Sequence, residues 1–155
     1  TALAFPNLIP ENNLAGNASA IVLATHGLAV NYEGGVSLPA LLSSDKGKLS
    51  LFTSSNLREF KLDGSIVILS ACDTAAGFVD REDLYYTGFV EGFADTGTEF
   101  IAASLWPVVS AASRNTTEAF FKTMKKSSNF FKSSLMAKKA PRVSLDALPF
   151  VFIYP

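Results

Sequence analysis

Three short apolar runs constrain the fold of this chain more than any other feature of its sequence. They read SAIVLAT (residues 19–25), SIVILSA (65–71) and EFIAASLW (99–106). Strands covered on both faces are apolar throughout, as in parallel sheets, whereas half-exposed strands alternate apolar and polar residues. We therefore predict three buried parallel strands, with PFVFIY (149–154) as a fourth strand at one edge.

Helical patterns lie between the apolar runs. Asn56 and Asn115 each suit the start of a helix. Helical spacing of apolar residues predicts a helix through Tyr86, Phe89, Val90 and Phe93. A last helix is predicted through Phe130, Phe131 and Leu135, ending before Pro141. A small hairpin is expected within residues 38–52, and nearly all of the 13 phenylalanines are assigned to core faces. Strands that alternate with helices predict an α/β fold, a mostly parallel sheet with helices on both faces. We expect a single domain over residues 1–155, as part of a longer polypeptide.

Composition excludes several classes of protein. Of the 155 residues, 48% are hydrophobic and 17% are charged, which excludes a disordered or collagen-like chain. One cysteine and one histidine can form neither an internal disulfide nor an ordinary zinc site, so no metal is expected. The longest apolar runs are too short to cross a bilayer, so no membrane partner is expected. These features are typical of a cytoplasmic domain.

Charge is divided unevenly along the chain. Residues 1–113 carry five basic and twelve acidic side chains, whereas residues 114–155 carry eight basic and two acidic ones. The basic residues are spread through two predicted helices, which favours a solvated helix face over a nucleic-acid site. No nucleic-acid partner is therefore expected.

The only histidine and the only cysteine occupy corresponding positions in the predicted sheet. His26 directly follows the first buried run, and Cys72 directly follows the second. The carboxyl ends of parallel strands form the edge at which open α/β proteins place their sites. If the two strands are neighbours, the imidazole and the thiol can face one another across a short gap.

An imidazole beside a thiol is the arrangement that nucleophilic catalysis by cysteine requires. The imidazole takes the thiol proton or stabilises the thiolate, and it can later protonate a leaving amine. Gly27 has no side chain, so its N–H, together with that of Cys72, can approach a developing oxyanion. The residues alone leave a second interpretation open, in which Cys72 is a small buried hydrophobe and His26 a structural or surface group.

Three motifs in order resemble the CHAT domain. They are VLATHG (22–27), VILSACDTAAG (67–77) and IAASLWPV (101–108), and the resemblance extends from about residue 18 to the final strand. CHAT domains are bacterial relatives of caspases and separase and are often fused to TPR repeats. The resemblance implies a caspase-like fold in which His26 is the catalytic base and Cys72 the nucleophile. It also implies a TPR-like or sensor region in the same polypeptide as a partner.

The sequence departs from the family pattern at two places near these motifs. Asp73 stands where the family commonly has glutamate, and residues 109–112 are neutral where many relatives are acidic. A pocket for a basic substrate side chain is therefore not expected from that stretch. Asp73 is a candidate substrate-binding residue because it belongs to an acidic loop that can steer a basic substrate toward the cleft. Trp106 is a second candidate, because by resemblance to the relatives its region borders the substrate cleft.

The reaction expected from these residues is hydrolysis of a peptide bond in a protein substrate, through a thioester on Cys72. This chemistry needs no cofactor, and we expect none. Two alternatives remain at this point. One is a non-catalytic caspase-like module for interaction or signalling, and the other is a different thiol hydrolase, which the missing Gly-x-Cys-x-Gly elbow around Cys72 disfavours.

Overall fold

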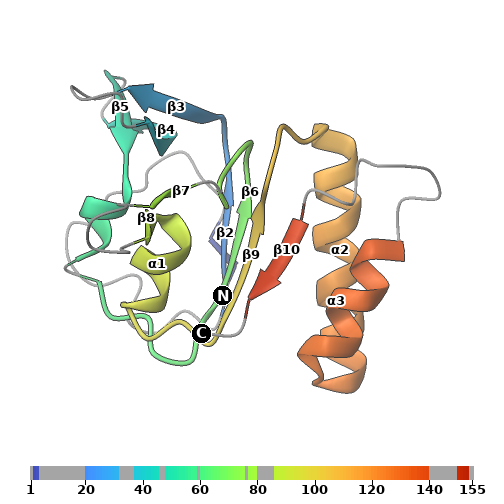
Figure 1. Cartoon of the computed structure of the whole chain (residues 1–155). Helices are drawn as coiled ribbons and strands as arrows, with labels where there is room; N and C mark the ends of the chain where they lie inside the picture. The colour runs from blue at the N-terminus through green and yellow to red at the C-terminus, as the bar shows by residue number, and fades with distance from the viewer. Residues whose placement is uncertain are drawn as a thin grey trace.

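A five-stranded sheet forms the middle layer of the fold, with α1 against one face and α2 and α3 against the other (Figure 1). The computed structural model describes residues 2–3, 20–31, 37–45, 48–58, 60–75, 77–79, 86–139 and 150–153. The central sheet contains β1 (Ala2–Leu3), β2 (Ala20–Ala24), β6 (Ile66–Ser70), β9 (Phe100–Ser104) and β10 (Phe150–Ile153). The helices are α1 (Phe89–Ala94), α2 (Ser110–Ser127) and α3 (Phe130–Lys139).

The central sheet has the strand order β1-β2-β6-β9-β10. Neighbouring strands are parallel except for β9 and β10, which are antiparallel. The predicted α/β fold, with a mostly parallel sheet covered on both faces, is therefore confirmed. The three apolar runs of the sequence form β2, β6 and β9, which are adjacent, and the predicted fourth strand is β10 at the edge.

A second, antiparallel sheet follows β2. It consists of β3 (Gly27–Asn31), β4 (Ser37–Asp45) and β5 (Lys48–Phe52). The predicted hairpin within residues 38–52 corresponds to β4 and β5. The sequence did not predict β3, because its apolar run, residues 28–30, is only three residues long and none of its five residues is buried. The pair β7 (Gly77–Val79) and β8 (Tyr86–Gly88) was not predicted either.

Helix boundaries differ from the predicted ones at three places. Tyr86 belongs to β8, so α1 begins later, at Phe89. The helix expected from Asn56 is one turn, the 3-10 helix η2 (Ser54–Leu57), in which the Asn56 side-chain oxygen accepts a hydrogen bond from the N–H of Thr53 at 2.8 Å. α2 begins at Ser110 rather than near Asn115. Within the described residues, none of the helices is both long enough and apolar enough to span a membrane.

Aromatic side chains fill the core on each face of the sheet. On the α1 side, the Phe89 ring stacks against Phe52 with 6.1 Å between centroids. On the side of α2 and α3, the Phe100 ring stacks against Phe120 at 4.7 Å and Phe130 at 5.2 Å. Both faces of the sheet are therefore buried, which explains why the strand sequences are continuously apolar.

Candidate active site

The carboxyl ends of β2 and β6 lie side by side. The two strands are parallel neighbours, and the last residues of each, Ala24 and Ser70, are partners in the ladder. His26 follows β2 by two residues, and Cys72 follows β6 by two residues. Sequence and register together therefore bring the only imidazole and the only thiol of the chain to the same edge of the sheet.

Gly27 and Cys72 are in direct backbone contact. A methyl group built on Gly27 would overlap the carbonyl oxygen of Cys72 and lie 2.9 Å from its nitrogen. Real Cβ atoms do not approach backbone atoms this closely, so only glycine fits at position 27. The absence of a side chain at Gly27 is what lets the segment carrying His26 approach the turn carrying Cys72.

A cavity of about 720 Å³ opens at this edge of the sheet. Its lining residues from the ends of β2 and β6 include His26 and Cys72. The His26 side chain is exposed, and Cys72 is half-buried. We call this cavity the His26–Cys72 cleft. Both predicted catalytic residues thus border a cleft large enough to admit a substrate segment.

Two buried side chains fasten the Cys72 turn to the end of β9. The Thr74 hydroxyl accepts a hydrogen bond from the N–H of Ser104 at 3.0 Å, and the Ser104 hydroxyl donates to the carbonyl oxygen of Ala71. The N–H of Ala75 donates to the carbonyl oxygen of Ser104 at 2.7 Å. Because Thr74 and Ser104 are fully buried, these bonds fix the turn from inside the protein.

Sequence reasoning did not single out Thr74 or Ser104 as positioning residues. The sequence did contain a signal for these two residues, because Thr74 lies within the motif around Cys72 and Ser104 lies within the third motif, IAASLWPV. Two motifs that are 30 residues apart at these positions contain the two ends of one hydrogen-bonded cluster. The order of the motifs could be recognised from the sequence, but their mutual contact could not.

Asp73 has a left-handed backbone conformation. Its φ of 55° is one of two positive values among the non-glycine residues that the structure describes. Aspartate tolerates this conformation better than most residues, because its short side chain can bond locally. The turn after Cys72 is therefore sharp, and it directs the chain back toward β9 immediately after the thiol.

The N–H of Gly27 is directed away from the antiparallel sheet. Gly27 faces Leu41 in the β3–β4 ladder, and the N–H of Leu42 donates to the carbonyl oxygen of His26 at 2.9 Å. In this pattern the amides of the facing pair point away from each other. Since β3 is an edge strand, the Gly27 N–H points toward its open edge.

The first turns of α2 form the opposite wall of the cleft. Ser113 reaches across to the end of β6, where its hydroxyl lies 2.5 Å from the Ser70 hydroxyl. Further along the wall, Arg114 donates to Glu118 at 2.8 Å, and both side chains are exposed. The wall therefore carries one cation and one anion that neutralise each other, rather than a single charge.

A family model of the CHAT domain matches residues 6–140. This chain belongs to the CHAT domain family. The family is caspase-like, and the predicted resemblance is confirmed. A comparison with curated protein sequences finds no match.

The two predicted substrate-binding residues of this CHAT domain lie outside the lining of the cleft. Asp73 is half-buried in the turn after Cys72, and Trp106 is 42% exposed beyond the end of β9. Val108, two residues after Trp106, does line the cleft. The segment that follows β9 thus reaches the cleft, whereas Trp106 is not among the residues that line it.

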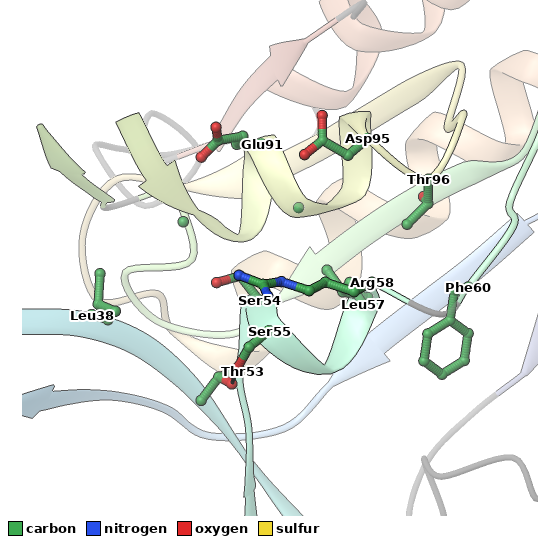
Figure 2. Close-up of a pocket in the computed structure, with 12 residues that line it drawn as sticks. Leu38, Thr53, Ser54, Ser55, Leu57, Arg58, Phe60, Glu91, Asp95 and Thr96 are labelled. Carbon is green, nitrogen blue, oxygen red and sulfur yellow. Dashed lines mark hydrogen bonds between the residues drawn. The ribbon is translucent and has the colours of Figure 1, made fainter. Parts of the chain in front are cut away.

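A second cavity of about 570 Å³ lies between η2 and α1 of the CHAT domain (Figure 2). Glu91 of α1 and Asp95, which directly follows α1, line it on one side, and Arg58 and the hydroxyl-bearing residues 53–55 line it on the other. Partial burial and the charge of Asp95 raise the pKa of the Glu91 carboxyl above its usual range. No nucleophilic pair borders this cavity, and the described residues contain no group of three ligands that could hold a metal.

Proposed function

We propose that this CHAT domain is a cysteine endopeptidase in which Cys72 is the nucleophile and His26 the general base. The single observation that supports this most strongly is the backbone contact between Gly27 and Cys72 at the mouth of a shared cleft. A scaffold that only bound partners would have no physical need for the sole imidazole and the sole thiol at one edge. Cleavage of a peptide bond uses both groups.

The reaction begins when His26 takes the proton from the Cys72 thiol. The sulfur attacks the scissile carbonyl carbon, forming an S–C bond and a tetrahedral oxyanion. The oxyanion collapses, the C–N bond breaks, and the leaving amine takes the proton held by His26. A water molecule, deprotonated by His26, then attacks the thioester and releases the acid product and the thiol.

The oxyanion has two candidate donors, the N–H groups of Gly27 and Cys72. The Gly27 N–H is free of the β3–β4 ladder by register, as described above. Donors fixed before the reaction stabilise the developing charge without reorganising, and removing one such donor in a serine protease costs about 10²–10³-fold in rate. The clamp between Thr74 and Ser104 supplies this fixed geometry on the Cys72 side.

The experiment that tests this function is cleavage of a peptide library whose members vary at every position. The whole chain, the Cys72→Ala variant and the His26→Ala variant are compared, with cleavage products identified by mass spectrometry. We expect cleavage by the natural chain, none by Cys72→Ala, and a loss of about 10²–10⁴-fold for His26→Ala, the usual contribution of a general base.

A matched control separates catalysis from reactivity of an exposed thiol. A peptide ending in an electrophile should label Cys72 in the folded chain faster than it labels the same chain unfolded in urea. Labelling at equal rates, together with no cleavage of the library by the natural chain, would remove the peptidase proposal. The non-catalytic interaction module would then be the better account.

A further inference from the structure

Apart from Phe130, which stacks against Phe100, the last helix of the domain has its large apolar side chains on the outside. The residues of α3 that are buried are small, Ser133, Ser134 and Ala137. Phe131, in contrast, is 74% exposed, and Leu135, one turn later, is 45% exposed. An exposed large apolar patch is more informative than a buried one, because folding of the domain does not account for it. Phe131 is thus an exception to the assignment of phenylalanines to core faces.

Basic side chains are interleaved with these apolar ones. We define the α3 outer face as Phe131, Leu135, Met136, Lys132 and Lys139, all of which are exposed. Residues 119–145 contain no aspartate or glutamate, so no carboxylate of this segment neutralises the lysines. The α3 outer face therefore combines apolar side chains with positive charge of one sign.

We propose that the α3 outer face docks onto the surface of an anionic lipid bilayer, with α3 lying in the plane of that surface. Helices that bind in this way present Phe or Leu to the acyl boundary and Lys or Arg to the headgroups. Lysine stems can lie along apolar surface while their ammonium groups remain with lipid phosphates. This peripheral contact is distinct from a membrane span, and it does not depend on peptidase activity.

The size and chemistry of the face favour a bilayer over a protein partner. The ten residues of α3 span only about 15 Å. A helix this short does not supply the roughly 800 Å² that each partner usually buries in a stable protein interface. Protein interfaces are also depleted in lysine and enriched in arginine and aromatic residues. A fluid anionic surface needs no shape complementarity and is attracted by each lysine in turn.

The charge asymmetry of the chain sets the orientation of docking. Residues 1–113 have an excess of acidic side chains, and the basic excess belongs to residues 114–155, although the formal net charge is only −1. An anionic surface therefore repels the larger part of the domain and attracts the region of α2 and α3. Binding of this kind weakens as salt screens the charges.

The test is flotation of the whole chain with lipid vesicles. Vesicles of neutral phosphatidylcholine are compared with vesicles containing roughly 30% phosphatidylglycerol, the anionic lipid that supplies the surface potential. We expect at least about tenfold stronger partitioning onto the anionic vesicles, and loss of the difference at high salt.

Variants place the contact on α3. Phe131→Ser should lower partitioning about tenfold, because it removes the aromatic side chain that the bilayer would bury. The double variant Lys132→Glu with Lys139→Glu should lower it at least about 25-fold, since each basic residue near such a surface contributes about fivefold. Two controls match these changes elsewhere: Leu49→Ser removes a side chain that is 77% exposed on β5, and Arg58→Glu reverses an exposed charge on the η2 side. Both controls should bind like the natural chain.

Three outcomes would overturn the proposal. They are equal partitioning onto neutral vesicles, equal loss of binding in the control and α3 variants, and capture by polyglutamate with no binding to either kind of vesicle. The last outcome would assign the face to an acidic protein instead. Circular dichroism of each variant confirms that it is folded before partitioning is measured.

Discussion

The ends of β2 and β6 meet at one cleft, but the protein holds them in place differently. After β6, buried hydrogen bonds between Thr74 and Ser104 fasten the Cys72 turn to β9. After β2, the chain passes directly into β3, and backbone bonds to β4 hold the segment while the His26 side chain is exposed. The thiol is positioned by buried side chains, and the imidazole by the backbone of its own segment together with the Thr25 hydroxyl, which donates to the carbonyl oxygen of Leu42 at 2.6 Å.

Because of this difference, substitutions at the two strand ends should have different effects on stability and on the reactivity of the thiol. Changes at the Cys72 turn should alter stability and reactivity together, because the same buried bonds serve both. Changes at the His26 side chain should alter reactivity alone, because little of the fold depends on an exposed side chain. Substitution of Gly27, where the two segments touch, should lower stability and thiol reactivity more than a substitution at either strand end.

The largest effect is expected for Gly27→Ala. The added methyl group overlaps the Cys72 backbone, and overpacking of this kind costs about 1–3 kcal/mol of unfolding free energy. Labelling of Cys72 by the electrophilic peptide should fall about 100-fold, because a shift of about 1 Å between reacting groups has that effect. Urea unfolding and labelling rates measure the two quantities. Gly92→Ala, a glycine in α1 at the second cavity, is the control that should label normally.

Thr74→Val should have the next largest effect. Valine keeps the shape but leaves buried groups of Ser104 and the Cys72 turn without a partner, at a cost of about 1–3 kcal/mol. Labelling should slow along with the loss of stability. Thr96→Val removes a buried hydroxyl that donates to Phe93 at 2.6 Å on the α1 side, so it should lower stability without slowing labelling. Equal labelling by the two variants would show that the Thr74 clamp does not position the thiol.

His26→Ala should change the unfolding free energy by less than about 0.5 kcal/mol, as is usual for an exposed side chain. Thermal unfolding monitored by circular dichroism tests this directly. A typical substitution lowers the unfolding free energy by about 1 kcal/mol. A loss of about 2 kcal/mol or more in His26→Ala would therefore make His26 a structural residue, and the two strand ends would no longer differ in this respect.

The smallest effect is expected at Glu91, which belongs to neither strand end. Its pKa is raised, so the ionised carboxylate costs stability once the pH rises above the ordinary value of 4.5, and the cost is complete above the raised value. Glu91→Gln should therefore raise the melting temperature slightly at neutral pH, and only slightly because solvent screens most of the charge on this side chain. The gain should vanish in acid, where both forms are neutral. Glu118→Gln, at an exposed ion pair, should show no such gain.

The sequence predicted the parts of this fold that depend on burial. The runs that became β2, β6 and β9 were recognised because both faces of the sheet are covered, and their ends located His26 and Cys72. The position of β3 could not be predicted, because its three apolar residues form too short a run and none of them is buried. The clamp between Thr74 and Ser104 depends on a contact between distant positions, which no local pattern contains.

The orientation of α3 shows a second limit of prediction from the sequence. Helical spacing predicted the helix, but Phe131 faces outward, whereas Phe130, Ser133 and Ala137 face the core. Periodicity identifies a helix when one face is apolar. It does not determine which face is buried when apolar residues lie on both.

The central claim, that Cys72 and His26 act as one unit, is tested most directly by alkylation of the chain's single thiol with a small neutral electrophile such as iodoacetamide. Substrate recognition plays no part in this reaction, so its rate reports the thiol and its surroundings. The account predicts alkylation that is at least about tenfold faster in the natural folded chain than in His26→Ala at neutral pH. Equal rates in the two folded proteins would contradict it.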